Sequence, residues 1–175
     1  MKSITKLVMF LMMISAPVMA NDIYVTQSGA TLTLDVLQDG QNNTIGNSTT
    51  ASTVTGATSN FNIDQVGNSN VLTFDINGAS YTGTFSTTGN SNDIDIKCDS
   101  GGTVSSCANV TASIAWVGSS NDIDIDVGET ADATGATINI TGASGSDSNV
   151  VAATIDGTSV IFTLSVNGDT NNFLV

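Results

Sequence analysis

The chain has no histidine and only three basic residues, and this shortage narrows its function before any motif is considered. Lys2 and Lys6 lie in the first twenty residues, together with all five methionines and the single proline. From residue 21 onward the chain has one basic residue, Lys97, and all 16 acidic residues, which gives this part a formal charge of −15. Because a nucleic-acid binder needs clustered Lys and Arg to neutralise phosphates, this composition excludes nucleic-acid binding.

The same composition leaves few groups for catalysis. General acid–base and nucleophilic catalysis usually rely on His, Lys or an activated Cys, and here only carboxylates remain, no two of which stand out as a pair. We therefore expect neither enzymatic activity nor a cofactor. With 40% hydrophobic and 11% charged residues, the chain is nevertheless expected to fold or assemble rather than to stay disordered.

The first twenty residues have the organisation of a secretory signal peptide. Two lysines precede an apolar run at 7–14, and small residues lead to a predicted cleavage site after Ala20. The run is too short for a membrane-spanning helix, which needs about 20 apolar residues. The sequence therefore predicts a signal peptide at 1–20 and a secreted or cell-surface domain at 21–175 with no membrane span.

Two cysteines, Cys98 and Cys107, enclose an eight-residue loop. An even number of cysteines in an exported protein favours a disulfide. The alternative, a redox or metal-binding pair, lacks CxxC spacing and a nearby histidine. We predict a structural Cys98–Cys107 disulfide.

A Gly-x-x-Asn motif recurs along the chain at intervals of 22 to 29 residues. A single copy is typical of any hairpin turn, whereas repeated copies in phase with apolar alternation indicate stacked repeats. The fifth copy, from Gly145 to Asn149, has one extra residue. The motif residues are Gly40 and Asn43, Gly67 and Asn70, Gly89 and Asn92, Gly118 and Asn121, Gly145 and Asn149, and Gly168 and Asn171.

Apolar and polar residues alternate on both sides of each motif, which is typical of strands with one buried face. Since one strand pair buries little surface alone, the pairs are expected to stack. The sequence thus predicts an all-β fold, a β-solenoid of about six strand-arc-strand repeats, with a two-sheet sandwich as the competing fold. Segments 46–59, 77–80 and 128–136 are expected to be outer loops.

Two of these repeats resemble the curlin repeat of curli fibre subunits. They run from Ser59 to Phe74, with Gln65, Gly67 and Asn70, and from Leu34 to Ile45, with Gln38, Gly40 and Asn43. The resemblance implies inward Gln and Asn ladders, glycines that permit the arcs, and subunits that polymerise outside the cell as functional amyloid. It also implies a nucleator subunit and an outer-membrane secretion pore as partners.

The other repeats depart from the curlin pattern. The position of the inward glutamine is expected to be taken by Thr87, Trp116, Ser144 and Val166. Trp116 could stack on a sugar, but its inward position favours packing in the core or arc.

Adjacent repeats also carry the sequence Asn-Asp-Ile-Asp-Ile, which would stack Asp93 on Asp122 and Asp95 on Asp124. Calcium could bridge such carboxylates, since it accepts several oxygen ligands with loose geometry. A solvated acidic face is the favoured interpretation, because no EF-hand or nonapeptide calcium repeat is present.

The hypothesis from sequence is therefore an exported structural subunit of curli-like fibres, serving biofilm matrix and surface adhesion. It would grow as a homopolymer by end-to-end strand addition, with the apolar C-terminal strand docking near residues 32–45. The alternative is a monomeric β-solenoid adhesin or ligand-binding surface protein, either dependent on calcium or independent of it.

Overall fold

The computed structural model describes residues 22–40, 42–47, 49–67, 69–98, 107–128, 133–143 and 145–175. The predicted signal peptide at 1–20, the loop at 99–106 and Ser144 lie outside these ranges. Within them, all regular elements are β-strands. No helix of the length and hydropathy that crossing a bilayer requires occurs in this part of the chain.

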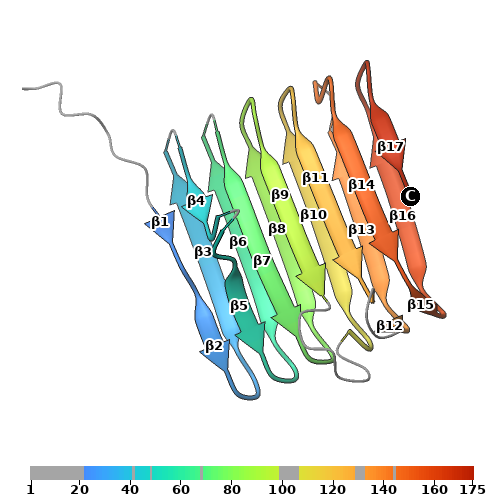
Figure 1. Ribbon diagram of the computed structural model, residues 1–175. Helices are drawn as coiled ribbons and strands as arrows, with labels where there is room; N and C mark the ends of the chain where they lie inside the picture. Colours follow the sequence, from blue (N-terminus) through green and yellow to red (C-terminus); the bar gives the residue numbers. More distant parts are fainter. Residues whose placement is uncertain are drawn as a thin grey trace, which may run out of the picture.

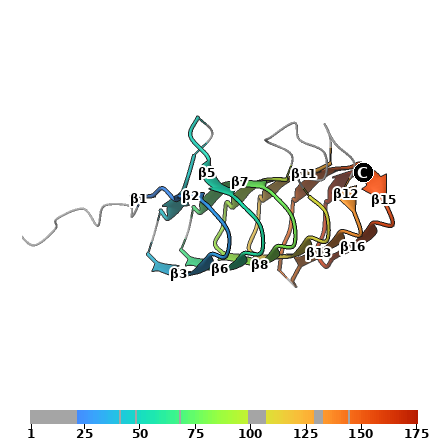
Figure 2. The same ribbon diagram turned by 90° about the horizontal axis from the view of Figure 1, so that it is seen from below.

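The strands form two long sheets and one short ribbon, and they pair in parallel throughout (Figures 1 and 2). Sheet A contains β1 (Asp22–Ile23), β2 (Thr26–Ser28), β4 (Thr44–Ile45), β5 (Ser52–Thr55), β7 (Val71–Asn77), β9 (Asp93–Cys98), β11 (Asp122–Val127), β14 (Val150–Ile155) and β17 (Asn172–Leu174). Sheet B contains β3 (Thr33–Asp39), β6 (Asn60–Val66), β8 (Thr82–Thr88), β10 (Thr111–Val117), β13 (Thr137–Gly142) and β16 (Ile161–Val166). The ribbon pairs β12 (Ala133–Thr134) with β15 (Gly157–Thr158).

The chain alternates between sheet B and sheet A and advances by one strand in each, which confirms the predicted all-β solenoid. Six strands of sheet B are joined by five parallel pairings, about five turns. The two sheets face each other across a single apolar core (Figure 2).

Side-chain alternation explains why the strands stack in register. One inward column in sheet B runs through Val36, Ile63, Phe85, Ile114, Ile140 and Leu164. A shift of one residue in any strand would turn its apolar side chains to solvent, so burial fixes the register.

Both ends of the solenoid are open. Phe85 and Ile114 in central strands are buried, whereas Val36 at one end and Leu164 at the other are only half-buried. Phe173 of β17 stacks on Val151 in the inward column of sheet A and is 45% exposed. Within the described residues, no element covers the inward side chains at either end.

The structure corrects the predicted outer loops. Segment 46–59 contains β5, which pairs with the second half of β7 while β4 pairs with the first half. Together β4 and β5 form one interrupted strand, because Ile45 pairs with Leu72 and Ser52 pairs with Phe74 of the same neighbouring strand. Segment 128–136 likewise contains β12.

Candidate functional site: the amide ladder and its surroundings

Five arc asparagines form a hydrogen-bonded ladder along the solenoid axis. Asn70 Nδ2 donates to Asn92 Oδ1 at 2.8 Å, and Asn92 Nδ2 donates to Asn121 Oδ1 at 2.7 Å. Asn121 Nδ2 donates to Asn149 Oδ1 at 2.6 Å, and Asn149 Nδ2 donates to Asn171 Oδ1 at 2.7 Å. All four bonds therefore point toward the C-terminal end.

Most of these amides also donate a hydrogen bond to a backbone carbonyl of their own arc. Four of them donate to the carbonyl oxygen three residues earlier, in the pairs Asn92 to Gly89, Asn121 to Gly118, Asn149 to Ser146 and Asn171 to Gly168. A buried primary amide is stable only when its donors and acceptor are satisfied. The arc and the ladder together meet this requirement in the central repeats.

Asn43 lies in the same column but does not extend the ladder, which corrects the sequence prediction. Its Nδ2 donates to the backbone carbonyls of Gln38 at 3.0 Å and Val66 at 2.6 Å. Within the described residues, the Oδ1 atoms of Asn43 and Asn70 have no hydrogen-bond partner. Asn43 Nδ2 thus bonds to two backbone carbonyls and not to Asn70 Oδ1, so the ladder begins at Asn70.

The arc glycines are needed because successive arcs lie in contact. A Cβ on Gly67 would lie 1.9 Å from the carbonyl oxygen of Gly40, and one on Gly118 would lie 1.4 Å from that of Gly89. Real Cβ atoms do not approach backbone oxygens this closely. A side chain at Gly67 or Gly118 would therefore push its arc away from the preceding one.

The fifth arc differs from the prediction. Asn149 bonds to Ser146, three residues earlier, and a Cβ on Gly168 would meet the Ser146 carbonyl at 1.9 Å. Ser146 therefore occupies the arc position that the sequence assigned to Gly145. A Cβ on Gly145 would meet nothing within 4 Å, so the extra residues of this repeat lie before the stacked arc.

The two inward glutamines form a pair rather than a ladder. Gln65 Nε2 donates to Gln38 Oε1 at 2.8 Å and to the Val71 carbonyl at 3.2 Å. The next residue in the column is Thr87, which is buried. Thr87 Oγ1 has no hydrogen-bond partner among the described residues, so the amide stack ends at Gln65.

The Gln column continues through Trp116 and then Gly142, which corrects the prediction of Ser144. Trp116 is 1% exposed and its indole fills the space beside the next strand. A Cβ on Gly142 would lie 2.7 Å from Cζ2 of Trp116. The large indole thus requires a residue without a side chain one rung further, and Val166 follows in the column.

The outward face of sheet A carries the predicted acidic columns. Asp93 stacks on Asp122 and Asp95 on Asp124, as the repeat implied. The lone cation of this face, Lys97, lies 3.4 Å from Asp126 Oδ2. Among the described residues, no group of three or more acidic or cysteine side chains is arranged to hold a metal ion.

Burial and mutual repulsion disfavour the charged form of several of these carboxylates. Burial, followed by the charges of Asp122 and Asp124, raises the pKa of Asp93 above 3.8. Burial also raises the pKa of Asp95, against the opposing effect of Lys97, and it raises that of Asp124. The folded chain therefore holds protons on this face more strongly than the unfolded chain does.

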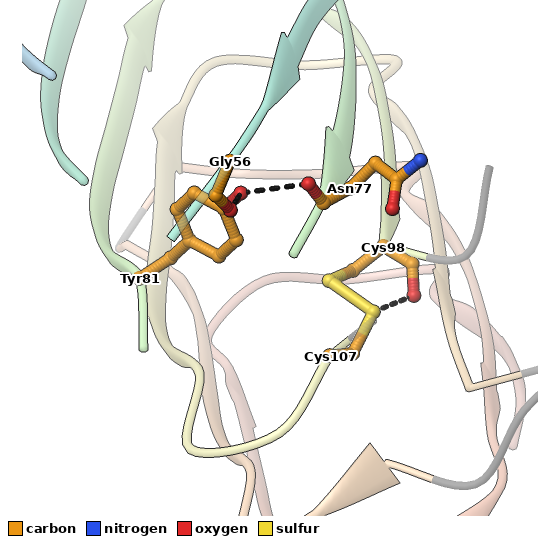
Figure 3. Close-up of a disulfide and its surroundings, with 5 residues drawn as sticks. All are labelled: Gly56, Asn77, Tyr81, Cys98 and Cys107. Atoms are coloured by element: carbon orange, nitrogen blue, oxygen red, sulfur yellow. Dashed lines mark hydrogen bonds between the residues drawn. A yellow bond between two sulfur atoms is a disulfide. The ribbon is translucent and has the colours of Figure 1, made fainter. Parts of the chain in front are cut away.

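Cys98 and Cys107 form a disulfide with a Cα–Cα distance of 5.7 Å, as predicted (Figure 3). Both residues are buried, Cys98 at the end of β9 and Cys107 just before β10. Nearby, the Tyr81 hydroxyl donates to the carbonyls of Gly56 and Asn77, the latter at 2.9 Å (Figure 3). The bond to Gly56 joins the connection before β8 to the connection before β6, and the bond to Asn77 joins it to the end of β7.

No family model, curated protein or solved structure was found to match the chain. The resemblance to curlin repeats therefore rests on the repeat residues alone.

Sequence reasoning missed the half-turn formed by β1 and β2 in front of the first complete repeat. β1 pairs with β4, and β2 pairs with β5. A signal for it is present, because residues 21–23 read Asn-Asp-Ile, as do residues 92–94 and 121–123. The half-turn has no Gly-x-x-Asn motif, on which the repeat count was based.

Proposed function

We propose that this chain is an exported structural subunit of extracellular curli-like fibres that serve a biofilm matrix and surface adhesion. The observation that carries the proposal is the pair of open solenoid ends, where inward apolar side chains are half-exposed. A solenoid that remains monomeric normally covers or charges its terminal strands. No chemical reaction is part of this function.

Growth would occur by end-to-end addition of parallel strands. β16 and β17 present unpaired backbone groups at one end, and β1, β2 and β3 present them at the other. Joining these edges would continue both sheets and bury Leu164 and Phe173 against Val36 and Ile23 of the next copy. The first half-turn thus replaces residues 32–45 as the sheet A docking edge.

The remaining partners follow from the curlin resemblance. An outer-membrane secretion pore would export the chain after the signal peptide is cleaved at Ala20. A nucleator subunit would present the first open edge on the cell surface. Both fit a subunit whose own ends offer strands rather than a separate binding pocket.

Electron microscopy of the purified chain beginning at residue 21 tests the proposal. Unbranched fibres that bind thioflavin and give a cross-β reflection at about 4.8 Å are expected, since the strands run across the solenoid axis. Monomers that persist at high concentration would contradict it.

The stacked Asp93–Asp122 and Asp95–Asp124 pairs favour a second candidate, a monomeric surface adhesin stabilised by calcium. In that case calcium should raise the unfolding midpoint more than magnesium does at equal ionic strength. Equal effects of the two cations would reject this candidate.

A further inference from the structure

Most of the outward face of sheet B is uncharged, unlike the outward face of sheet A. Its last four strands, β8, β10, β13 and β16, carry no ionisable side chain. The outward positions are Thr82, Thr84, Ser86, Thr88, Thr111, Ser113, Ala115, Val117, Thr137, Asn139, Thr141, Ile161, Thr163 and Ser165. We call these positions the neutral face.

Charge is concentrated elsewhere on the described strands. The outward side of sheet A holds the acidic columns, and sheet B has its carboxylates only on β3 and β6, at Asp35, Asp39 and Asp64. In a chain with a formal charge of −13, two copies repel when acidic surfaces meet. The neutral face is the broad surface where two copies can meet without bringing carboxylates together.

The neutral face also exposes apolar surface. Val117 is 41% exposed and Ile161 is 60% exposed. The threonines add methyl groups in columns, at the strand spacing of about 4.8 Å. Small and β-branched side chains on a regular sheet can interdigitate with those of a second sheet in a dry interface.

We propose that the neutral face is the surface through which two filaments of this chain pair side by side, with a second copy as its partner. This proposal rests on the proposed fibre function. Like faces pack against like, so the contact is self-complementary.

The size of the face determines when it acts. Four strands of about six residues cover roughly 400 Å² on each copy, or about 800 Å² in total at standard strand dimensions. Stable interfaces between proteins bury about 1,200–2,000 Å². One pair of subunits is therefore below this range, whereas filaments add one contact for each subunit. Single chains should remain unpaired, and filaments should bundle.

Charge placed on the neutral face tests the proposal. Thr84 and Ser113 are register neighbours on β8 and β10, and both side chains are exposed. In the double variant Thr84→Glu, Ser113→Glu, filaments should elongate within about twofold of the wild-type rate but stay single under negative stain. The matched control Thr55→Glu, Thr154→Glu adds the same charge to sheet A and should still bundle.

A charge-reversed variant, Thr84→Lys, Ser113→Lys, extends the test. Its filaments should also stay single alone and should pair again when mixed with Glu-variant filaments. Three results would contradict pairing through the neutral face. They are bundles of wild-type width in the Glu variant, single filaments in the sheet A control, and a Lys–Glu mixture whose filaments stay single. If wild-type filaments form but never pair, only the pairing proposal fails. If the wild-type chain forms no filaments, the proposed fibre function fails as well.

Discussion

The indole nitrogen of Trp116 donates a hydrogen bond to Asn149 Oδ1 at 3.1 Å, one turn further along the solenoid. The bond joins the inward glutamine column to the asparagine ladder. Asn149 Oδ1 thereby accepts from both Asn121 and Trp116. The indole also occupies the space where a side chain at position 142 would lie. Trp116 thus orients Asn149 and requires glycine at position 142.

We expect Gly142→Ala to destabilise the chain by about 1–3 kcal/mol, because the new Cβ would clash with Cζ2 of Trp116 and Cγ1 of Val166. In a Trp116→Leu background the same change should cost less, since the indole is gone. Urea denaturation of a double-mutant cycle measures the coupling. The exposed neighbour Thr141→Ala is the control, and strictly additive costs would contradict the packing.

The ladder should tolerate no acidic replacement at its centre. Asn121→Asp keeps the shape but removes both N–H bonds, to Gly118 and Asn149, and sets oxygen against oxygen in a buried column. We expect a loss of about 2–5 kcal/mol at pH 7, with partial recovery in acid as the carboxyl becomes protonated. The exposed Asn90→Asp should change the denaturation midpoint little. Similar midpoints for the two variants would argue against the ladder.

The repeat register could be predicted because period-two alternation leaves one arrangement that buries every apolar column. The fifth arc could not, since Gly145 matches the motif in sequence while Asn149 selects Ser146 by a hydrogen bond three residues back. Ser144 lies five residues before Asn149, as Gln38 lies five before Asn43, so the motif spacing predicts it, whereas the structure places Gly142 beside the indole of Trp116. Such errors arise where a neighbouring turn, rather than local sequence, decides the position.

The position of each asparagine could likewise be predicted, but its hydrogen bonds could not. Asn43 and Asn121 occupy the same motif position, yet Asn43 bonds to the Val66 carbonyl and Asn121 bonds to Asn149. Asn70 uses both kinds of acceptor, the Thr88 carbonyl and Asn92 Oδ1. A repeat motif contains no information on that choice.

Acidification should stabilise the folded chain. The pKa values of Asp93, Asp95 and Asp124 are raised above 3.8, chiefly by burial, so the native state binds more protons than the unfolded state between 3.8 and the raised values. Stability is then highest below this window and falls as pH rises through it. Denaturant midpoints at pH 4 and pH 7 measure the difference. Asp124→Asn should reduce it, and a midpoint that rises with pH would contradict the effect.

Loss of the Cys98–Cys107 disulfide should weaken the fold without abolishing it. The bond closes a short loop, with a sequence separation of 9. In the chain-entropy model such a closure contributes about 2–3 kcal/mol. We expect reduction, or the double change Cys98→Ala, Cys107→Ala, to lower the denaturation midpoint accordingly while β-sheet circular dichroism persists. Complete unfolding on reduction would mean that the disulfide holds far more of the structure than this loop.

Neighbouring residues at each open end provide the sharpest test of end-to-end growth. Phe173 and Leu174 lie on the same strand, but Phe173 continues the inward column of Val151 while Leu174 lies on the outward face and is 74% exposed. Phe173→Lys would place a charge where the next copy must pack, and burying it without a partner costs several kcal/mol. Thioflavin kinetics should show elongation falling at least tenfold in Phe173→Lys and staying near the wild-type rate in Leu174→Lys, with folded monomers in both.

The opposite end offers a second matched pair, because Val36 faces inward on β3 and Leu37 faces outward at 70% exposure. Val36→Lys should block elongation as Phe173→Lys does, and Leu37→Lys should not. Each blocked variant retains one intact end, so a mixture of Val36→Lys and Phe173→Lys chains should form one-to-one dimers, measurable by analytical ultracentrifugation, while either variant alone stays monomeric. A blocked variant that dimerises alone would show that like ends join. Unimpaired elongation in both blocked variants would rule out growth through the open ends and leave the monomeric adhesin as the better account of the acidic face.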